Sequence, residues 1–154
     1  MPPAPPSLKG RALRLLSMRE YSRLELERRL QPFEEEPGAL ARVLDELEAK
    51  GFISAQRVLE SVLHRKSAKL GVLRLRQELQ SKGLPAEAVQ EAVGQLHATE
   101  VERARAIWRK KFGTAPTNPA ERAKQMRFLA GRGFSSDTIQ RVVSGADDGD
   151  CADI

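Results

Sequence analysis

Apolar residues recur along most of the chain at intervals of three and four, which is the spacing of one face of an α-helix. The stretches 40–47 and 89–96 each place an apolar residue at positions i, i+3, i+4 and i+7. No stretch shows the sustained alternation of apolar and polar residues that indicates a half-buried β-strand. The pattern therefore predicts an all-α protein.

Residues that commonly end or begin helices divide this pattern into short segments. Gly51, Gly83 and Gly133 each follow an apolar stripe and a basic residue, where glycine often terminates a helix. Ser22 and Glu25 have the spacing of a capping box at a helix start. We expect helices near residues 8–18, 22–31, 37–50, 54–69, 71–82, 86–97, 100–112, 119–132 and 136–145.

The segments resemble one another at a fixed distance along the chain. Residues 79–85 and 129–135 match around glycines that lie 50 positions apart, and 24–30 is a fainter copy of 73–79. A fixed period of this length indicates one supersecondary unit used several times. We expect three tandem three-helix repeats in an elongated, curved array, whose function comes from an extended surface.

The repeats are predicted at residues 8–52, 53–98 and 99–145. Before them lies a proline-rich start, 1–7, and after them an acidic tail, 146–154. Both flanking segments have too few apolar residues to offset the entropy cost of ordering, so we expect them to be disordered.

The charge balance favours a polyanionic partner. The chain has 26 basic and 21 acidic residues, and four of the acidic residues are aspartates of the tail, which leaves a net charge of +9 before Asp147. Cationic surfaces of this kind suit nucleic acid or an acidic protein. The alternative is that the charges only solvate ordinary helix faces.

The remaining composition points to a cytoplasmic protein. Cys151 is the single cysteine, which excludes a disulfide framework and a cysteine-based metal site. No apolar run approaches the roughly 20 residues of a membrane span, and the first residues do not form a signal peptide. We expect no membrane association.

Catalytic chemistry has little support in the sequence. The Walker-type loop and the common zinc-protease and serine-hydrolase motifs are absent. His64 and His97 stand alone, and the run 34–36 of three glutamates is best interpreted as solvated loop charge. We predict no enzyme activity, no cofactor and no metal.

Aromatic residues of the last repeat have two interpretations. Trp108 and Phe112 continue an apolar stripe, and Phe134 follows a helix-ending glycine as Leu84 and Phe52 do, so core positions are favoured. The alternative is that these rings and Phe128 stack on nucleic-acid bases.

Basic residues recur with the repeats. Arg65 and Lys66 near the end of one predicted helix are echoed by the basic run 109–111 about one repeat later. Stacked repeats could align such clusters into a cationic stripe. Arg74 and Arg76 are two positions apart, and residues at this spacing point to different sides of a helix. We therefore do not expect these two arginines to serve one contact. The candidate partner- or DNA-binding residues are Arg65, Lys69, Arg74, Arg76, Arg109, Lys110 and Arg127.

Several motifs in this order resemble the bacterial RecX regulatory proteins, over about residues 8–145. They are Tyr-Ser-Arg-Leu-Glu-Leu-Glu-Arg-Arg-Leu (21–30), Gly-Phe-Ile-Ser (51–54), Leu-Arg-Leu-Arg-Gln-Glu-Leu-Gln-Ser-Lys-Gly-Leu (73–84) and Trp-Arg-Lys-Lys-Phe-Gly (108–113). The resemblance implies a non-enzymatic, monomeric protein that binds the RecA recombinase filament on single-stranded DNA. It also implies modulation, usually inhibition, of the ATPase, co-protease and strand-exchange activities of RecA in recombination and DNA repair.

Two other functions remain open on the residues alone. The chain could be a helical module that binds nucleic acid without RecA, because three-helix units also occur in helix-turn-helix proteins. It could also be a scaffold for another acidic protein. A steep dependence on salt, with tight binding to naked DNA, would favour the first of these.

Overall fold

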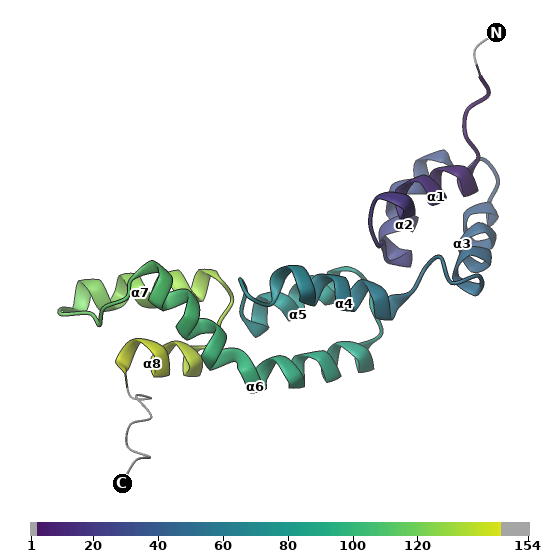
Figure 1. Cartoon of the computed structure of the whole chain (residues 1–154). Coiled ribbons are helices and arrows are strands. Elements are labelled where there is room, and N and C mark those ends of the chain that lie inside the picture. Colours follow the sequence, from purple (N-terminus) through teal and green to yellow (C-terminus); the bar gives the residue numbers. More distant parts are fainter. Residues whose placement is uncertain (1–2, 146–154) are drawn as a thin grey trace.

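The computed structural model describes residues 3–145, and within that range it contains helices and no β-strand. Figure 1 shows an elongated, curved array with α1 to α3 at one end and α7 and α8 at the other. The predicted all-α repeat fold is confirmed. The elements are α1 (Leu8–Met18), α2 (Arg23–Leu30), the 3₁₀-helix η1 (Gln31–Phe33), α3 (Ala39–Ala49), α4 (Ala55–Lys66), α5 (Val72–Ser81), α6 (Ala86–Lys111), α7 (Pro119–Gly131) and α8 (Ser136–Ser144).

Three separate hydrophobic clusters follow one another along the array. The first includes Leu26, Leu44 and Leu47 of α2 and α3, all fully buried. The second is built by α4, α5 and the first half of α6, and the third by the second half of α6 with α7 and α8. Short helices are individually marginal in water, so burial of these stripes supplies most of their stability.

The predicted helix ends are largely observed. Ser22 and Glu25 form the complete capping box, in which each side chain accepts a hydrogen bond from the other residue's backbone N–H. Gly83 and Gly133 have φ angles of 69° and 87° and follow the last residue of α5 and α7 by two positions. Ser135 caps α8, because its hydroxyl accepts a hydrogen bond from the Thr138 N–H.

One predicted break between helices is wrong. Helices were expected to end at residue 97 and begin again at 100, but α6 runs for 26 residues without interruption. The two intervening residues, Ala98 and Thr99, contain no helix breaker, and the buried stripe continues from Leu96 through Glu100 to Ala104. The last helix of the second repeat and the first helix of the third are therefore one rod.

Each repeat contacts the preceding repeat through the same turn. A methyl group added at Gly83 would lie 2.8 Å from a side-chain carbon of Leu24, and one added at Gly133 would lie 2.2 Å from the Cβ of Arg74. Both members of the second pair lie 50 residues beyond those of the first. The turn after the second helix of a repeat thus packs on the second helix of the preceding repeat.

The aromatic residues mostly occupy core positions. Phe134 is buried, and Trp108 and Phe128 are partly buried against the third cluster. Phe52 differs from the expectation, because 47% of it is exposed and Ile53 beside it fills the core position instead.

The flanking segments are only partly described. Residues 3–7 have no regular structure, and Ser7 accepts a hydrogen bond from the Gly10 N–H at the start of α1. The acidic tail, predicted to be disordered, lies outside the described residues. In the range 3–145, none of the helices combines the length and apolar character needed to cross a membrane.

Candidate interaction surface

All seven candidate cations are exposed, and they lie on the second and third repeats. None of the seven forms an ion pair with a residue of the described range, although the Arg74 guanidinium is bound to a backbone carbonyl. Exposed cations without an internal partner keep their charge available for a partner molecule.

Arg65 and Lys69 lie where α4 ends. Arg65 donates only to the Ser61 carbonyl of its own helix, at 3.3 Å. The helix was expected to reach residue 69 but ends at Lys66, so Lys69 belongs to the turn before α5. Lys66, the neighbour of Arg65, is paired with Glu78 instead.

Arg74 and Arg76 point to different sides of α5. Arg74 Nη1 donates to the Gly131 carbonyl of the third repeat at 3.0 Å, so this arginine helps to join two repeats. Arg76 lines a shallow hollow of about 360 Å³ together with Gln80 and Gln90. The two arginines therefore cannot serve one contact, as their spacing predicted.

Arg109 and Lys110 lie in the last turn of α6. Cations at a helix C-terminus are favoured by the helix dipole, so part of their role is structural. Arg127 lies on α7, the helix that follows. Arg103 of α6 contacts the turn after α4, which holds Lys69. Arg109 and Lys110 lie six and seven residues beyond Arg103, which corresponds to roughly 10 Å along the helix axis.

The structure adds two cations that are not among the seven candidates, Lys111 and Arg132. Lys111 Nζ and the guanidinium carbon of Arg132 lie 5.4 Å and 5.2 Å from the centre of the Phe128 ring. Phe112 contacts the same ring edge to face, at a centroid distance of 5.4 Å. Surfaces that bind single-stranded nucleic acid combine basic residues with aromatic rings on which bases stack.

Charge increases along the array. The first repeat has nine basic and nine acidic residues, the second has seven and four, and the third has ten and four. The net charges of the three repeats are therefore 0, +3 and +6. All of the net positive charge of residues 8–145 therefore lies on the second and third repeats, and the first repeat is neutral.

Glu100 in the middle of α6 fixes the third repeat to the second. It is 1% exposed, and its Oε2 accepts a hydrogen bond of 2.8 Å from the backbone N–H of Val72 at the start of α5. Its Oε1 accepts hydrogen bonds from the N–H and hydroxyl of Ser135 and from the hydroxyl of Thr138, at 2.6 to 3.1 Å. One buried carboxylate thus sits at the N-termini of two helices, where the helix dipoles favour negative charge.

The pKa of Glu100 reflects these contacts. Burial by itself raises it, but the hydrogen bonds from Thr138, Ser135 and Val72 outweigh burial, so that the pKa lies below its ordinary value. The carboxylate is therefore held in its charged form at neutral pH.

Three consecutive N–H groups at the start of α5, those of Gly71, Val72 and Leu73, are satisfied from the third repeat. Gly71 donates to the Arg132 carbonyl at 2.8 Å and Leu73 to the Gly133 carbonyl at 3.0 Å, on either side of the Val72 bond to Glu100. A methyl group on Gly71 would lie 2.4 Å from the Gly133 carbonyl. The beginning of α5 is therefore built to accept another repeat, since helix N-termini otherwise leave such donors without partners.

Arg103, one turn beyond Glu100, holds the turn between α4 and α5. Its Nη1 donates to the carbonyls of Ser67 and Leu70, both at 2.7 Å, and its Nη2 donates to the Leu96 carbonyl at 3.0 Å. The Arg103 guanidinium is bound to these backbone carbonyls, so we do not count it as part of the cationic surface.

The joint between the first and second repeats is also polar. Glu25 of α2 accepts hydrogen bonds from Arg19 at 2.9 Å and from Lys82 of the second repeat at 3.2 Å. Burial raises the pKa of Glu25, but the bonds from the Ser22 backbone, Arg19 and Lys82 outweigh it and lower the pKa to about 2. A second bridge links Arg57 to Glu20 at 2.8 Å.

The histidines and acidic residues of the range 3–145 do not gather into a metal-binding cluster. His64 and His97 are both exposed, and no group of three His, Cys, Asp or Glu side chains is placed to hold a metal ion. In the run of three glutamates, Glu34 accepts a hydrogen bond from the Leu40 N–H at 2.8 Å and so caps α3. That role was not predicted.

Comparisons with known proteins agree with the all-α repeat fold. Residues 56–93 match the family model for the second three-helix domain of RecX, and residues 98–143 match the model for the third. Regulatory protein RecX of Leptothrix cholodnii is 50% identical over 141 residues, which cover 92% of this chain and 90% of the relative. The relative of the same name from Ralstonia pickettii is 45% identical, with 99% of each chain covered.

The fold is also found in solved structures. The crystal structure of RecX from Lactobacillus salivarius superposes with a TM-score of 0.72 at 19% sequence identity, covering 91% of this chain and 94% of that chain. A similarity at this level of identity supports the fold alone.

Proposed function

Since the chain belongs to the RecX family of regulatory proteins, we propose that it binds the RecA filament on single-stranded DNA and inhibits its ATPase, co-protease and strand-exchange activities. The observation that carries this proposal is the charge distribution, which rises from 0 to +3 to +6 along three linked repeats. Such an array can follow an elongated polyanionic assembly and contact neighbouring subunits at once.

The joints support a multivalent mode of binding. The turn at Gly133 packs on Arg74, and Glu100 accepts a hydrogen bond from the start of α5. In this proposal these contacts hold the third repeat on the second, so that the cations of both repeats bind together. Linked contacts of this kind can raise the overall affinity by about 10² to 10⁴ over one contact. Bridging of protomers would then restrict the subunit motion that ATP turnover needs.

In this proposal the exposed cations form the binding surface. Arg109 and Lys110 at the end of α6 and Arg127 on α7 contribute from the third repeat, and Arg65, Lys69 and Arg76 contribute from the second. Arg74 serves mainly to join the repeats, because its guanidinium is bound to the Gly131 carbonyl. The protein would act as a non-enzymatic cytoplasmic monomer.

A second function has a specific observation in its favour. Phe128, flanked by Lys111 and Arg132, offers a partly buried aromatic ring with two cations beside it. That arrangement could stack on a base of single-stranded DNA without any RecA.

Binding measured by fluorescence anisotropy separates the two functions. Labelled single-stranded DNA, either naked or fully covered by RecA with a non-hydrolysable ATP analogue, is titrated with the protein between about 50 and 300 mM salt, a roughly sixfold range that includes physiological ionic strength. Regulation of RecA predicts that the covered filament is bound more tightly than naked DNA near 150 mM salt. Tighter binding to naked DNA, lost in the Phe128→Ala variant, would favour the module that acts alone.

A further inference from the structure

The first repeat carries no net charge, yet it exposes an apolar groove lined by arginines. Met18 and Phe33 are 66% and 46% exposed, and both line one hollow of about 360 Å³ between α1 and η1. We call it the α1–η1 groove and define it by the side chains that carry its chemistry: Arg11, Arg14, Leu15, Met18, Arg29 and Phe33. Two of the four large apolar side chains exposed in the described range thus meet in one place.

The three arginines of the groove are not engaged in ion pairs. The guanidinium of Arg11 lies 3.8 Å from the centre of the Phe33 ring, and that of Arg29 lies 5.6 Å from the ring of Tyr21. Arg14 and Arg29 are exposed, and none of the three has a carboxylate partner among residues 3–145. No carboxylate lines the groove.

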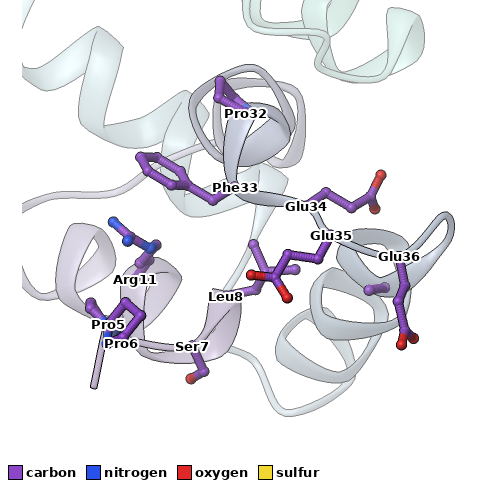
Figure 2. Close-up of a pocket in the computed structure, with 11 residues that line it drawn as sticks. Pro5, Pro6, Ser7, Leu8, Arg11, Pro32, Phe33, Glu34, Glu35 and Glu36 are labelled. Carbon is purple, nitrogen blue, oxygen red and sulfur yellow. The ribbon is translucent and has the colours of Figure 1, made fainter.

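Three of the nine acidic side chains of this repeat line the hollow next to the groove. That hollow, of about 530 Å³, shares Arg11 and Phe33 with the groove and is also lined by Glu34, Glu35 and Glu36. Figure 2 shows Phe33 and Arg11 together on one side of it, with Glu34 and Glu36 on the other. The charges of the first repeat are therefore separated locally, although they sum to zero.

We infer that the α1–η1 groove binds a segment of the partner protein that inserts a large apolar side chain and carries acidic residues beside it. Met18, Leu15 and Phe33 provide the apolar contact, and the arginines pair with the flanking carboxylates. Aromatic and arginine side chains often dominate the energy of protein interfaces, which suits this composition.

The same chemistry speaks against a membrane. Arginines beside apolar side chains can bind anionic lipid. Here the three glutamates lie immediately beyond Phe33 and would face the same anionic surface, which disfavours that approach. A protein segment can contact the groove and avoid the glutamates.

The inference rests on the proposed function, and the test keeps the two apart. A photo-crosslinking amino acid, p-benzoylphenylalanine, replaces Met18 in one variant and Ala49, an exposed residue of α3, in the other. Each variant is illuminated with RecA filaments on single-stranded DNA, and the crosslinked peptides are identified by mass spectrometry. A crosslink from position 18, absent from position 49, to a RecA peptide with acidic residues beside an apolar one is expected.

Affinity provides an independent readout with a matched control. Phe33→Ala should weaken binding to RecA filaments about tenfold and leave binding to naked DNA unchanged. Phe52 lies outside the groove and is exposed to the same degree, 47% against 46%, so Phe52→Ala should bind as the wild type does.

Each other outcome overturns the inference in a distinguishable way. Wild-type binding to filaments with no crosslink at position 18 and no effect of Phe33→Ala rejects the groove and leaves the proposed function intact. A crosslink only to a second copy of this chain, or binding to vesicles of anionic lipid that Phe33→Ala abolishes, assigns the groove to another occupant. A wild-type protein that binds no filament rejects both proposals.

Discussion

A carboxylate oxygen of Glu100 accepts a hydrogen bond of 2.8 Å from the backbone N–H of Val72, the first residue of α5. In the predicted division of the chain, Val72 lies in the second repeat, 53–98, and Glu100 lies in the third, 99–145. The bond satisfies a helix-start donor that would otherwise be buried without a partner, and it does so with a charged acceptor, which strengthens it. Glu100 therefore helps to place the third repeat on the second, together with the uninterrupted helix α6 and the bonds that Gly71 and Leu73 donate to the turn after α7.

Removal of this carboxylate should destabilise the joint. Glu100→Ala leaves the N–H groups of Val72 and Ser135 buried without an acceptor, so we expect the free energy of unfolding to fall by about 3 kcal/mol. Urea unfolding followed by circular dichroism measures the change. Glu102→Ala, two residues away and exposed, is the matched control and should have little effect. Equal behaviour of the two variants would show that the Glu100 contacts add no stability.

Replacement of glycine by alanine should lower stability at Gly71 and raise it at Gly94. Gly71→Ala places a methyl group 2.4 Å from the backbone of Gly133, so the joint must open, and we expect a loss of more than about 2 kcal/mol. Gly94→Ala meets no atom within 4 Å in the interior of α6 and should raise stability by about 0.5 to 1 kcal/mol. Thermal unfolding of both variants, with small-angle scattering for Gly71→Ala, checks the expectation. A stabilised Gly71→Ala protein would contradict the described contact.

Much of the fold could be predicted because the repeat is visible in the sequence. Gly83 and Gly133 lie 50 residues apart and have the same structural role, because each allows a turn to approach a helix of the preceding repeat. The capping box of Ser22 and Glu25 is also local, and local signals of this kind are read from sequence.

The joint itself could not be predicted from local signals. Glu100 lies on the buried stripe between Leu96 and Ala104, so an acidic residue on an apolar face was a visible sign. The predicted break at 98–99 concealed it, because the stripe then seemed to end at residue 96. Whether Glu100 is buried depends on α5 and α8, which contact it from residues 28 and 35 to 38 positions away.

For the candidate binding residues, only their exposure is observed, and their role in binding stays a prediction. Exposure of the seven cations follows from helical spacing, which the sequence contains. The engagement of Arg74 with Gly131 does not, because it depends on the third repeat docking against α5.

Stability should depend on pH through Glu25. Its pKa of about 2 in the folded protein lies below the ordinary value of 4.5, so folding favours the charged form. The resulting stability is fully present above pH 4.5 and is lost as the pH falls toward 2. Urea unfolding at several pH values in this window should show the loss, and Glu25→Gln should reduce the slope. An unchanged slope in that variant would assign the acid sensitivity to other carboxyls, of which Glu100 is the next to test.

Reversal of the cations on α6 should weaken filament binding. Arg109→Glu with Lys110→Glu changes the charge of the third repeat from +6 to +2, and we expect at least tenfold weaker binding to RecA filaments near physiological salt. Both side chains are exposed and lie only in the last turn of α6, so any loss of helix should be confined to that turn, which circular dichroism checks. Arg42→Glu with Lys50→Glu makes the same change in net charge on the first repeat and should have a smaller effect. Equal loss in the two double variants would indicate that net charge alone matters.

The most direct test of RecA regulation is ATP hydrolysis by RecA on single-stranded DNA, titrated with this protein near physiological salt. Multivalent contact along the filament predicts strong inhibition at well below one molecule per RecA protomer. Hydrolysis that stays unchanged up to equimolar protein, while the protein remains folded and binds naked DNA, would contradict RecA regulation and favour the module that binds DNA alone.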